Sequence, residues 1–448
     1  MNTIEQIAAQ LQGYDPQAMT ADGVRDFLAR LVTPVQGVLE LPLFEALGRV
    51  LAADVISPFD VPPHDNSAMD GFAFDGAQLA PDAALDLQVV GTALAGKAWL
   101  GSVQPGQCVK IMTGAVMPAG LDTVVPQEFV TLNRTDETDR IAIPAGLLRT
   151  GDNRRLRGED LAQGKAALQK GEFLTPARLG LAASLGLKTV STWRPLRVAY
   201  FSTGDEILSL GQAPREGAVY DSNRYTVFGM LSRLGCQVID MGVVRDEPAL
   251  LEAAFTEAAA QADAIITSGG VSVGEADYTK AMMKKLGDVA FWRIAMRPGR
   301  PMAVGRISSI KSAISAHPAS ISSYENSSNE HGAVLFGLPG NPVAVMVTFL
   351  AFVRPALLRM MGARPEPTLL LKAHSTEAIR KKPGRTEYQR GFVSTAPDGS
   401  LQVKTTGSQG SGVLRSMAEA NGLIVLHHGQ DNVAVSDEVD VMMFDGAM

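Results

Sequence analysis

The sequence has few of the features that identify several common classes of protein. It has only two cysteines, Cys108 and Cys236, in 448 residues, too few for a disulfide framework or a cysteine zinc site. The six histidines show no H-x-x-x-H spacing with an acidic partner, so any bound cation would take oxygen ligands. No G-x-x-x-x-G-K-S/T motif occurs, and this excludes a P-loop nucleotide triphosphatase at the level of motifs.

Long stretches of uniform character are also missing. Lys and Arg total 40 and Asp and Glu total 47, which gives a net charge of −7, and no long basic run occurs, so we expect no nucleic-acid partner. The longest apolar stretch, residues 343–353, is too short to span the roughly 30 Å core of a membrane. The N-terminus lacks the basic and apolar regions of a secretory signal. We therefore expect a cytoplasmic protein with no membrane partner.

The apolar pattern changes several times along the chain, which indicates several domains. Residues 16–55 and 160–190 carry apolar residues at helical spacing, whereas 72–150 contain short strand-like runs between turn residues. Strand and helix patterns alternate from about 193 to 362, which is typical of βαβ units around a mostly parallel sheet. The pattern becomes strand-like again over residues 367–448.

These patterns predict a multidomain protein of the α/β plus β class. The predicted domains are a helical linking domain (1–60 with 151–192), a small β domain (61–150), a central α/β domain (193–364) and a C-terminal β-barrel-like domain (365–448). Within the α/β domain, residues 307–332 are rich in serine and interrupt the pattern, so we expect a loop there.

Polar and glycine-rich loops follow four predicted strands of the α/β domain, where ligands bind in open parallel sheets. These loops contain residues 203–206, 245–247, 267–277 and 339–342. Glycine-rich loops allow backbone N–H groups to approach a phosphate, and Mg²⁺ favours carboxylates together with substrate phosphates. The loops therefore predict a Mg²⁺–phosphate site, although ordinary βα turns favour the same residue types.

Three groups of arginines could balance an anionic ligand. They are Arg154, Arg155 and Arg157; Arg293, Arg297 and Arg300; and Arg390. The R-P-G-R-P turn, residues 297–301, holds two guanidinium groups on a rigid loop and so suits an oxyanion. The alternative is a solvated turn, whose arginines would contribute little.

Residues 270–274 match G-x-S-x-G, the nucleophile-elbow pattern of serine hydrolases. The preceding strand is expected to end at Ile266, with Thr267, Ser268 and Gly269 before the motif. Carboxylates follow the motif and no later histidine stands out as a base. We therefore do not expect a serine hydrolase.

A series of segments, in order along nearly the whole chain, resembles one known family. They are PPHDNSAMDGFA, KIMTGAVMPAGLDTVVPQE, RRLRGEDL, STGDEI, YDSN, ITSGGVSVGEADYTK, RPGRP, LPGNPVAVMVTF and TTGSQGSGVL. This family is the molybdopterin molybdenumtransferases, which includes MoeA and the E domain of gephyrin. The resemblance implies a molybdopterin-binding type of α/β domain and a homodimer. It implies an enzyme that inserts molybdate into adenylylated molybdopterin with Mg²⁺ and releases AMP.

The resemblance also implies roles for individual residues. Catalytic roles fall on Asp70, Thr113, Asp160, Glu206, Asp246 and Asp277, of which Glu206, Asp246 and Asp277 would bind the metal. Substrate contacts fall on Thr267, Ser268, Gly269, Gly270, Arg293, Arg297, Arg300, Pro339, Pro342, Arg390 and Ser411. Arg390 and Ser411 would face the site of the partner subunit. The arginines at 293, 297 and 300 stand where relatives often carry lysine.

Two other functions stay open on the sequence alone. A scaffold or interaction protein of the gephyrin type would share the resemblance, but we expect no appended domain or long linker in this chain. A molybdopterin adenylyltransferase would share the α/β domain, but the additional β domains and their acidic loops favour the molybdenumtransferase.

Overall fold

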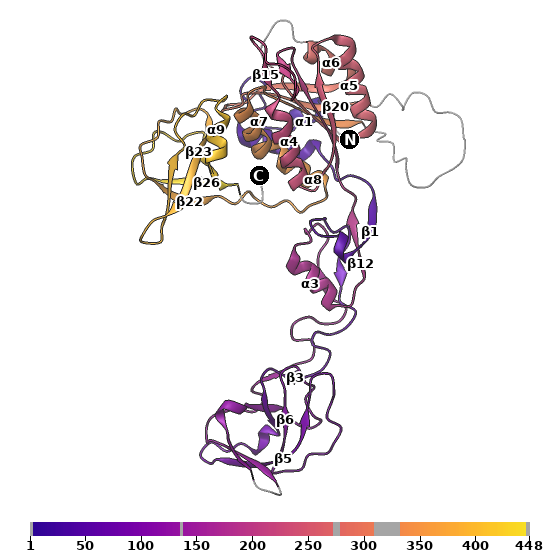
Figure 1. Cartoon of the computed structure of the whole chain (residues 1–448), viewed down its shortest axis with the longest axis vertical. Coiled ribbons are helices and arrows are strands. Elements are labelled where there is room, and N and C mark those ends of the chain that lie inside the picture. Colours follow the sequence, from indigo (N-terminus) through magenta and orange to yellow (C-terminus); the bar gives the residue numbers. More distant parts are fainter. Residues whose placement is uncertain (1–2, 135–137, 272–277, 309–331, 445–448) are drawn as a thin grey trace, which may run out of the picture. The chain divides into compact units, whose positions relative to one another are not determined.

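The computed structural model describes residues 3–134, 138–271, 278–308 and 332–444. They form two compact units (Figure 1). The first unit comprises Met1–Ala53, Lys170–Thr175 and Thr189–Met448, and the second comprises Asp54–Gln169 and Pro176–Lys188. The chain therefore leaves the first unit after Ala53 and returns to it twice.

The first unit is built around a six-stranded sheet with the order β16-β13-β17-β21-β20-β18. Its strands are β13 (Arg197–Thr203), β16 (Gln237–Val244), β17 (Ala264–Ser268), β18 (Gly287–Arg293), β20 (Pro301–Ile307) and β21 (Ala333–Leu338). The strands β16, β13, β17 and β21 are parallel, which confirms the prediction of a mostly parallel sheet. Strands β20 and β18 add an antiparallel edge that the sequence pattern does not predict.

Helices follow the strands of this sheet and pack on it. They are α4 (Ser222–Arg233), α5 (Pro248–Gln261), α6 (Tyr278–Leu286), α7 (Pro342–Thr348) and α8 (Arg354–Met360), with the π-helical segment Phe349–Val353 between α7 and α8. Asp221 caps α4 by accepting a hydrogen bond from a backbone N–H of its first turn. Along β13, Tyr200 packs into the apolar cluster that contains α7, whereas Phe201 packs with Phe255 of α5 in a second cluster. Alternate residues of one strand thus form two cores.

One helical stretch in the described part of the chain, Pro342–Met360, is long and apolar enough to cross a membrane, with a mean hydropathy of 1.8. Within the protein, 78% of this stretch is buried. Its residues belong to the same apolar cluster as Phe336 of β21. A helix that is apolar on all sides and covered by protein fits the core of a large domain.

The N-terminal residues of the first unit form two capped helices and a strand. Helices α1 (Ile4–Ala9) and α2 (Ala21–Leu31) begin after Thr3 and Thr20, whose side chains accept backbone hydrogen bonds. Strand β1 (Val38–Pro42) pairs with β12 (Thr189–Trp193). The helix predicted over 16–55 is therefore right for α2 and wrong for β1, which pairs along its whole length with β12. A 3-10 turn, Leu43–Glu45, follows β1, and two short strands, β14 (Ile207–Leu208) and β15 (Val219–Tyr220), pair beside the central sheet.

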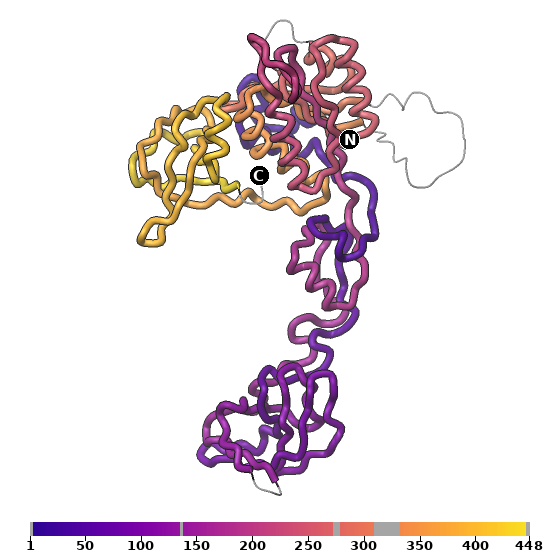
Figure 2. Tube along the Cα trace, in the orientation of Figure 1, coloured from indigo at the N-terminus to yellow at the C-terminus, as the bar shows by residue number. Residues whose placement is uncertain are grey.

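The C-terminal part of the first unit supplies five strands, drawn in orange-yellow to yellow in Figure 2, of a second six-stranded sheet. Its strands are β19 (Met296–Arg297), β22 (Leu371–Ser375), β23 (Thr386–Thr395), β24 (Leu401–Thr405), β25 (Gly422–Leu426) and β26 (Glu438–Met443), with helix α9 (Leu414–Glu419) before β25. The additional pairing of β23 with β25 closes five of the strands into a ring. The barrel-like domain predicted here is confirmed. Strand β19 lies outside the ring and pairs with the first residues of β23. This pairing connects the R-P-G-R-P turn, which begins at Arg297, to the second sheet.

The second unit contains a six-stranded sheet with the order β7-β4-β6-β5-β9-β8. Its strands are β4 (Gly71–Phe74), β5 (Leu85–Ala93), β6 (Gln107–Ile111), β7 (Thr123–Pro126), β8 (Thr131–Arg134) and β9 (Asp139–Ile143), with 3-10 turns at Gly76–Gln78 and Gln127–Phe129. Cys108 and Val109 of β6 lie in different apolar clusters, so both faces of this sheet are covered.

The remaining residues of the second unit form short pairs and one helix. Strand β2 (Val55–Ile56) pairs with β11 (Ala166–Leu168), and β3 (Asn66–Ser67) pairs with β10 (Arg154–Arg155). Helix α3 (Pro176–Ser184) is the only part of residues 160–190 that is helical. The helix predicted over the whole range is wrong for β11, because the backbone of β11 pairs with that of β2 instead. In the first unit, residues 309–331 of the predicted serine-rich loop lie outside the described residues.

Candidate functional site

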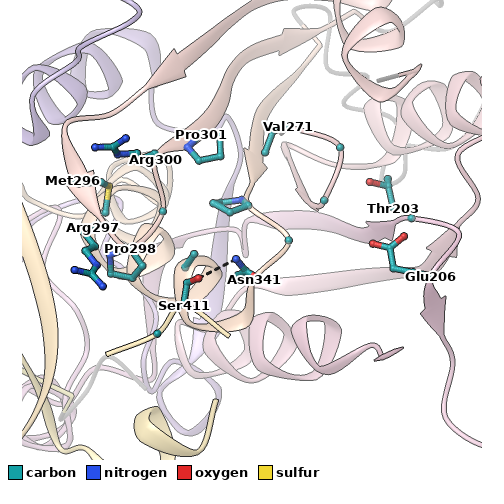
Figure 3. A pocket seen from close by; sticks show the side chains of 18 of the residues that line it. Thr203, Glu206, Val271, Met296, Arg297, Pro298, Arg300, Pro301, Asn341 and Ser411 are labelled. Atoms are coloured by element: carbon teal, nitrogen blue, oxygen red, sulfur yellow. Dashed lines mark hydrogen bonds between the residues drawn. The ribbon is translucent and has the colours of Figure 1, made fainter. Parts of the chain in front are cut away.

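A cavity of about 780 Å³ lies in the first unit where the parallel strands end (Figure 3). Loops after β13, β16, β17 and β21 form one part of its wall. The R-P-G-R-P turn and two segments of the C-terminal sheet region form the other part. The lining residues from the strand ends are Thr203, Gly204, Glu206, Asp246, Gly269, Gly270, Val271, Pro339, Gly340 and Asn341. The position agrees with the rule that open α/β sheets bind ligands at the carboxyl ends of their strands.

The glycines after β17 are required by the close approach of neighbouring chain segments. Gly269 has φ +94°, and a Cβ there would lie 2.4 Å from the carbonyl oxygen of Thr203. Gly270 has φ +64°, and a Cβ there would lie 2.5 Å from Cβ of Thr279. Both conformations favour glycine over any residue with a side chain. The strand itself continues to Ser268, two residues beyond the expected end at Ile266.

That longer strand changes the position of two predicted substrate contacts. Thr267 and Ser268 are buried inside β17 and do not line the cavity. The Ser268 hydroxyl lies 2.7 Å from the Tyr200 hydroxyl, which also lies 2.9 Å from Ser202 Oγ. Burial raises the pKa of Tyr200, although the two serines act in the opposite direction. These three hydroxyls form a neutral polar layer beneath the loops, and only Gly269 and Gly270 of the predicted group reach the cavity.

The strand-end wall of the cavity is acidic. Glu206 and Asp246 both line it, and the Thr279 hydroxyl donates to Asp246 Oδ1 at 3.1 Å. The backbone N–H of Asp246 donates to Asp205 Oδ1 at 3.3 Å, which connects the two strand-end loops. The third predicted metal ligand, Asp277, lies outside the described residues.

The donor set on this wall fits Mg²⁺ bound together with a substrate. Within the described ranges, no group of three His, Cys, Asp or Glu side chains could enclose a metal ion. Mg²⁺ does not need such a group, because it is commonly held by one or two carboxylates plus substrate phosphates and water. Glu206 and Asp246 supply two hard oxygen donors on one wall, so the residues present fit a Mg²⁺ ion, and its binding stays a prediction.

The opposite wall is basic. Arg297 and Arg300 line the cavity, and Figure 3 shows them on the side away from Glu206. In the described part of the chain, neither guanidinium has a hydrogen-bond or ion-pair partner. The turn between them is tightly packed, because a Cβ at Gly299, with φ +87°, would lie 2.5 Å from Thr348 Oγ1 of α7. Two unpaired cations on a fixed turn favour an anionic ligand.

Ser411 reaches this cavity from the C-terminal sheet region of its own chain. Its hydroxyl accepts a hydrogen bond from Asn341 Nδ2 at 3.0 Å, and its carbonyl oxygen accepts one from the Val343 N–H at 3.1 Å. Gln409 and Gly410 line the cavity beside it. The structure therefore places Ser411 at the site of its own chain, whereas the resemblance implied the site of a partner.

Arg390 is close to this wall but does not line it. Its side chain is 1% exposed and donates to the carbonyl oxygens of Ser408, Gln409 and Gly410. Burial and the positive charge of Arg297 lower the pKa of Arg390 to about 10. Arg390 therefore stabilises the loop that carries Ser411. Its guanidinium donates hydrogen bonds to that loop, not to the cavity.

The structure adds one cation that the sequence analysis missed, Arg385. It lines the cavity, and its side chain is 23% exposed. The sequence could have indicated this residue. In a strand, every second side chain lies on the same face, so the strand pattern places Arg385 on one face with Glu387 and Gln389. Two other predicted contacts are displaced: Arg293 is exposed at the end of β18, and Pro342 begins α7, while Pro339 does line the cavity.

Three predicted catalytic residues, Asp70, Thr113 and Asp160, belong to the second unit. The structure brings two of them together, because the Thr113 N–H and hydroxyl donate to Asp70 Oδ1 at 2.6 and 2.7 Å. These two hydrogen bonds, the backbone one first, lower the pKa of Asp70. Asp160 is exposed, and its backbone N–H donates to the carbonyl oxygen of Val61.

A second cavity of about 560 Å³ lies beside the first strand-end loop. Its lining residues are Gly204, Asp205, Ile207, Leu208, Ser209, Gln212, Arg215, Val243, Arg245 and Glu247. Gly204 lines both cavities, so Glu206 and Asp246 face one of them while their neighbours in sequence face the other.

Three segments of the chain match described protein families. Residues 19–186 match the MoeA N-terminal region (domain I and II), residues 199–359 a probable molybdopterin binding domain, and residues 372–444 the MoeA C-terminal region (domain IV).

Similar proteins match over most of the chain. A molybdopterin molybdenumtransferase of Haemophilus influenzae is 39% identical over 428 residues, which cover 95% of this chain and 98% of the relative. One of Nostoc sp. is 35% identical over 406 residues, covering 89% and 87%. The crystal structure of a molybdopterin biosynthesis moeA protein from Pyrococcus horikoshii superimposes with a TM-score of 0.75 at 25% identity, covering 95% of this chain and 100% of that one. The chain therefore belongs to the molybdopterin molybdenumtransferase family.

Proposed function

We propose that this enzyme inserts molybdate into adenylylated molybdopterin and releases AMP in a Mg²⁺-dependent reaction. One observation carries the proposal: a single cavity has two carboxylates on one wall and, on the other, two guanidinium groups that have no partner among the described residues. A reaction between a substrate with a metal-bound pyrophosphate and a separate oxyanion requires such a division of charge. The names of the relatives support the same chemistry.

Arg297 and Arg300 would bind the molybdate dianion. Each guanidinium offers several N–H donors in a fixed plane, which suits the oxygens of a tetrahedral oxyanion. The rigid turn loses little freedom on binding, because Gly299 is packed against α7. Ser411 adds a neutral hydroxyl that Asn341 holds in place. These residues would keep molybdate beside the sulfur atoms of the pterin, and proximity of this kind accelerates a reaction between bound partners.

Glu206 and Asp246 would hold the metal, and Asp277 is proposed as a third ligand from the resemblance. When bound there, Mg²⁺ would neutralise charge on the pyrophosphate as AMP leaves. The backbone of Gly269 and Gly270 approaches closely enough to contact the phosphates, because neither residue has a side chain in the way. The Thr279 hydroxyl keeps the Asp246 carboxylate oriented.

Further parts of the proposal come from the resemblance. Asp70, Thr113 and Asp160 of the second unit are proposed as catalytic residues, and the hydrogen bonds from Thr113 would keep Asp70 ionised. We also propose that the protein is a homodimer in the cytoplasm. Sedimentation equilibrium should then give a mass near twice the 47.4 kDa of the chain, and a monomer mass at assay concentrations would contradict this.

The test is the dependence of AMP release on molybdate. Purified protein, supplied with adenylylated molybdopterin and Mg²⁺, should release AMP only when molybdate is added. Omission of Mg²⁺ or addition of a chelator should stop the release. An adenylyltransferase would instead release pyrophosphate from ATP and molybdopterin, and a scaffold protein would release neither product. Either of those results would overturn the proposed function.

A further inference from the structure

Arg385 has one buried carboxylate as its partner. Its Nε donates to Glu387 Oε1 at 2.8 Å, and its Nη2 lies 2.7 Å from the same oxygen. Only 3% of the Glu387 side chain is exposed, so this hydrogen-bonded ion pair is shielded from water. The second oxygen, Oε2, accepts a hydrogen bond from Gln389 Nε2 at 3.1 Å. Both carboxylate oxygens are therefore used inside the C-terminal sheet.

Two other cations near Glu387, Arg297 and Lys381, make different contacts. Arg297 is its register partner in the β19–β23 pairing, yet no ion pair joins them among the described residues. The Lys381 ammonium donates to the carbonyl oxygens of Lys382 and Gln430. Among the cations of the described residues, Arg385 is the one that pairs with this carboxylate, and the Nε–Nη2 edge of its guanidinium is engaged.

The other edge of the guanidinium is available to the cavity. Arg385 lines the cavity with Arg297 and Arg300, and its Nη1 has no hydrogen-bond partner in the part of the chain that the structure describes. A guanidinium held along one edge presents the remaining N–H groups in a set direction. A long arginine side chain would otherwise lose considerable rotamer freedom on binding a ligand.

We propose that Glu387 is a positioning residue that fixes Arg385 as a third cation of the oxyanion site. This inference rests on the proposed function, in which molybdate is the oxyanion. Glu387 does not touch the ligand. It acts by holding the Arg385 guanidinium in the orientation that the bound oxyanion requires, before the oxyanion arrives.

The sign of the effect separates this role from a simple electrostatic one. Glu387 carries a negative charge near an anion site, so removal of that charge alone would strengthen anion binding. Loss of positioning would weaken it. Glu387→Gln removes the charge but keeps the size, and its amide cannot accept from both Arg385 and Gln389 as the carboxylate does.

The experiment measures molybdate binding by isothermal titration calorimetry on the full-length protein without the pterin substrate, and then AMP release against molybdate concentration. Glu387→Gln should weaken molybdate binding about tenfold, the difference expected when a charge-assisted hydrogen bond is replaced by a neutral one. The molybdate concentration for half-maximal activity should rise in parallel, while kcat at saturating molybdate should change little. In the Arg385→Ala background, Glu387→Gln should change binding less than about twofold, because the residue it positions is gone.

Glu419→Gln is the matched control. Glu419 also pairs with an arginine, Arg415, at 2.6 Å, but the pair is exposed and does not line the cavity. Its molybdate affinity should equal that of the wild type. If Glu387→Gln does not fold, as judged by its melting curve, Glu387→Asp replaces it: the shorter carboxylate keeps the charge, withdraws from Arg385 and should also weaken binding.

Three results would overturn the inference: unchanged binding in Glu387→Gln, tighter binding in Glu387→Gln, or an equal loss with and without Arg385. Failure of the proposed function gives a different pattern. In that case the wild type would release no AMP when molybdate is added, whatever the affinities of the variants.

Discussion

The two walls of the cavity are built in different ways from the same chain. The acidic wall consists of loops that directly follow β13, β16 and β17 of one parallel sheet. The basic wall combines the R-P-G-R-P turn with Arg385 and the 409–411 loop, which belong to or pair with a different sheet. The first wall therefore depends on one topological rule, whereas the second depends on the contact between two sheets.

This difference has consequences for how each wall tolerates change. Glycines and short turns fix the acidic wall by backbone geometry, as at Gly269 and Gly270. On the basic wall Gly299 fixes one turn in the same way, but the rest depends on side-chain hydrogen bonds, as Arg390 holds three carbonyl groups of the Ser411 loop. We expect substitutions on the acidic wall to have large, all-or-none effects, and those on the basic wall to change affinity by degrees.

The largest effect is expected for Asp246→Asn. The amide keeps the size of the side chain and can still accept the hydrogen bond from Thr279, but it loses the charge that would bind Mg²⁺. AMP release should fall by on the order of 10²-fold or more at saturating Mg²⁺ and molybdate. The measurement is the initial rate of AMP formation, together with a melting curve to show that the fold is intact.

Glu247→Gln is the control for this substitution. Glu247 is the next residue, but it lines the second cavity. Its rate should stay within about twofold of the wild type, since surface substitutions of this kind have small effects. Equal rates for Asp246→Asn and the wild type would show that the metal is not bound at this wall.

An intermediate effect, on stability, is expected for Gly269→Ala. The new Cβ would lie 2.4 Å from the Thr203 carbonyl oxygen, at a φ of +94° that alanine rarely adopts. The free energy of unfolding should fall by about 2–3 kcal/mol, as measured by urea denaturation. Gly412→Ala is the comparison, because a Cβ there meets nothing within 4 Å. Equal stability of the two variants would show that the loop can shift and that the acidic wall is less rigid than proposed.

The residues of the acidic wall can be located from the sequence because each part of this wall is local. The alternation of strands and helices places β13, β16, β17 and β21, and the residues after them are then the cavity residues. The error at Thr267 and Ser268 has a simple cause: the strand extends two residues further, and those side chains turn into the polar layer around Tyr200. The four domain boundaries stay a prediction, because the contacts group the chain into two units.

The basic wall was harder to predict because it depends on pairing between distant segments. β19 pairs with β23 across nearly ninety intervening residues, a relation between Arg297 and Glu387 that no local pattern indicates. Arg390 is predicted as a substrate contact from the resemblance, and in the structure its guanidinium donates to the carbonyl oxygens of residues 408–410. Arg385, which directly precedes β23, lines the cavity but is not among the predicted site residues.

The smallest effect is expected for Arg297→Ala, which removes one cation of the basic wall. The molybdate concentration for half-maximal AMP release should rise about tenfold, the loss expected for one hydrogen-bonded charge contact, with nucleotide affinity nearly unchanged. The pKa of Arg390, which the Arg297 charge helps to lower, should also rise, but Arg390 stays protonated at neutral pH in both proteins. Arg415→Ala, which removes an exposed arginine away from the cavity, should leave both affinities unchanged. Weaker nucleotide binding with an unchanged molybdate dependence would move the R-P-G-R-P turn to the phosphate side of the site, and the division of charge between the two walls would then have to be reassigned.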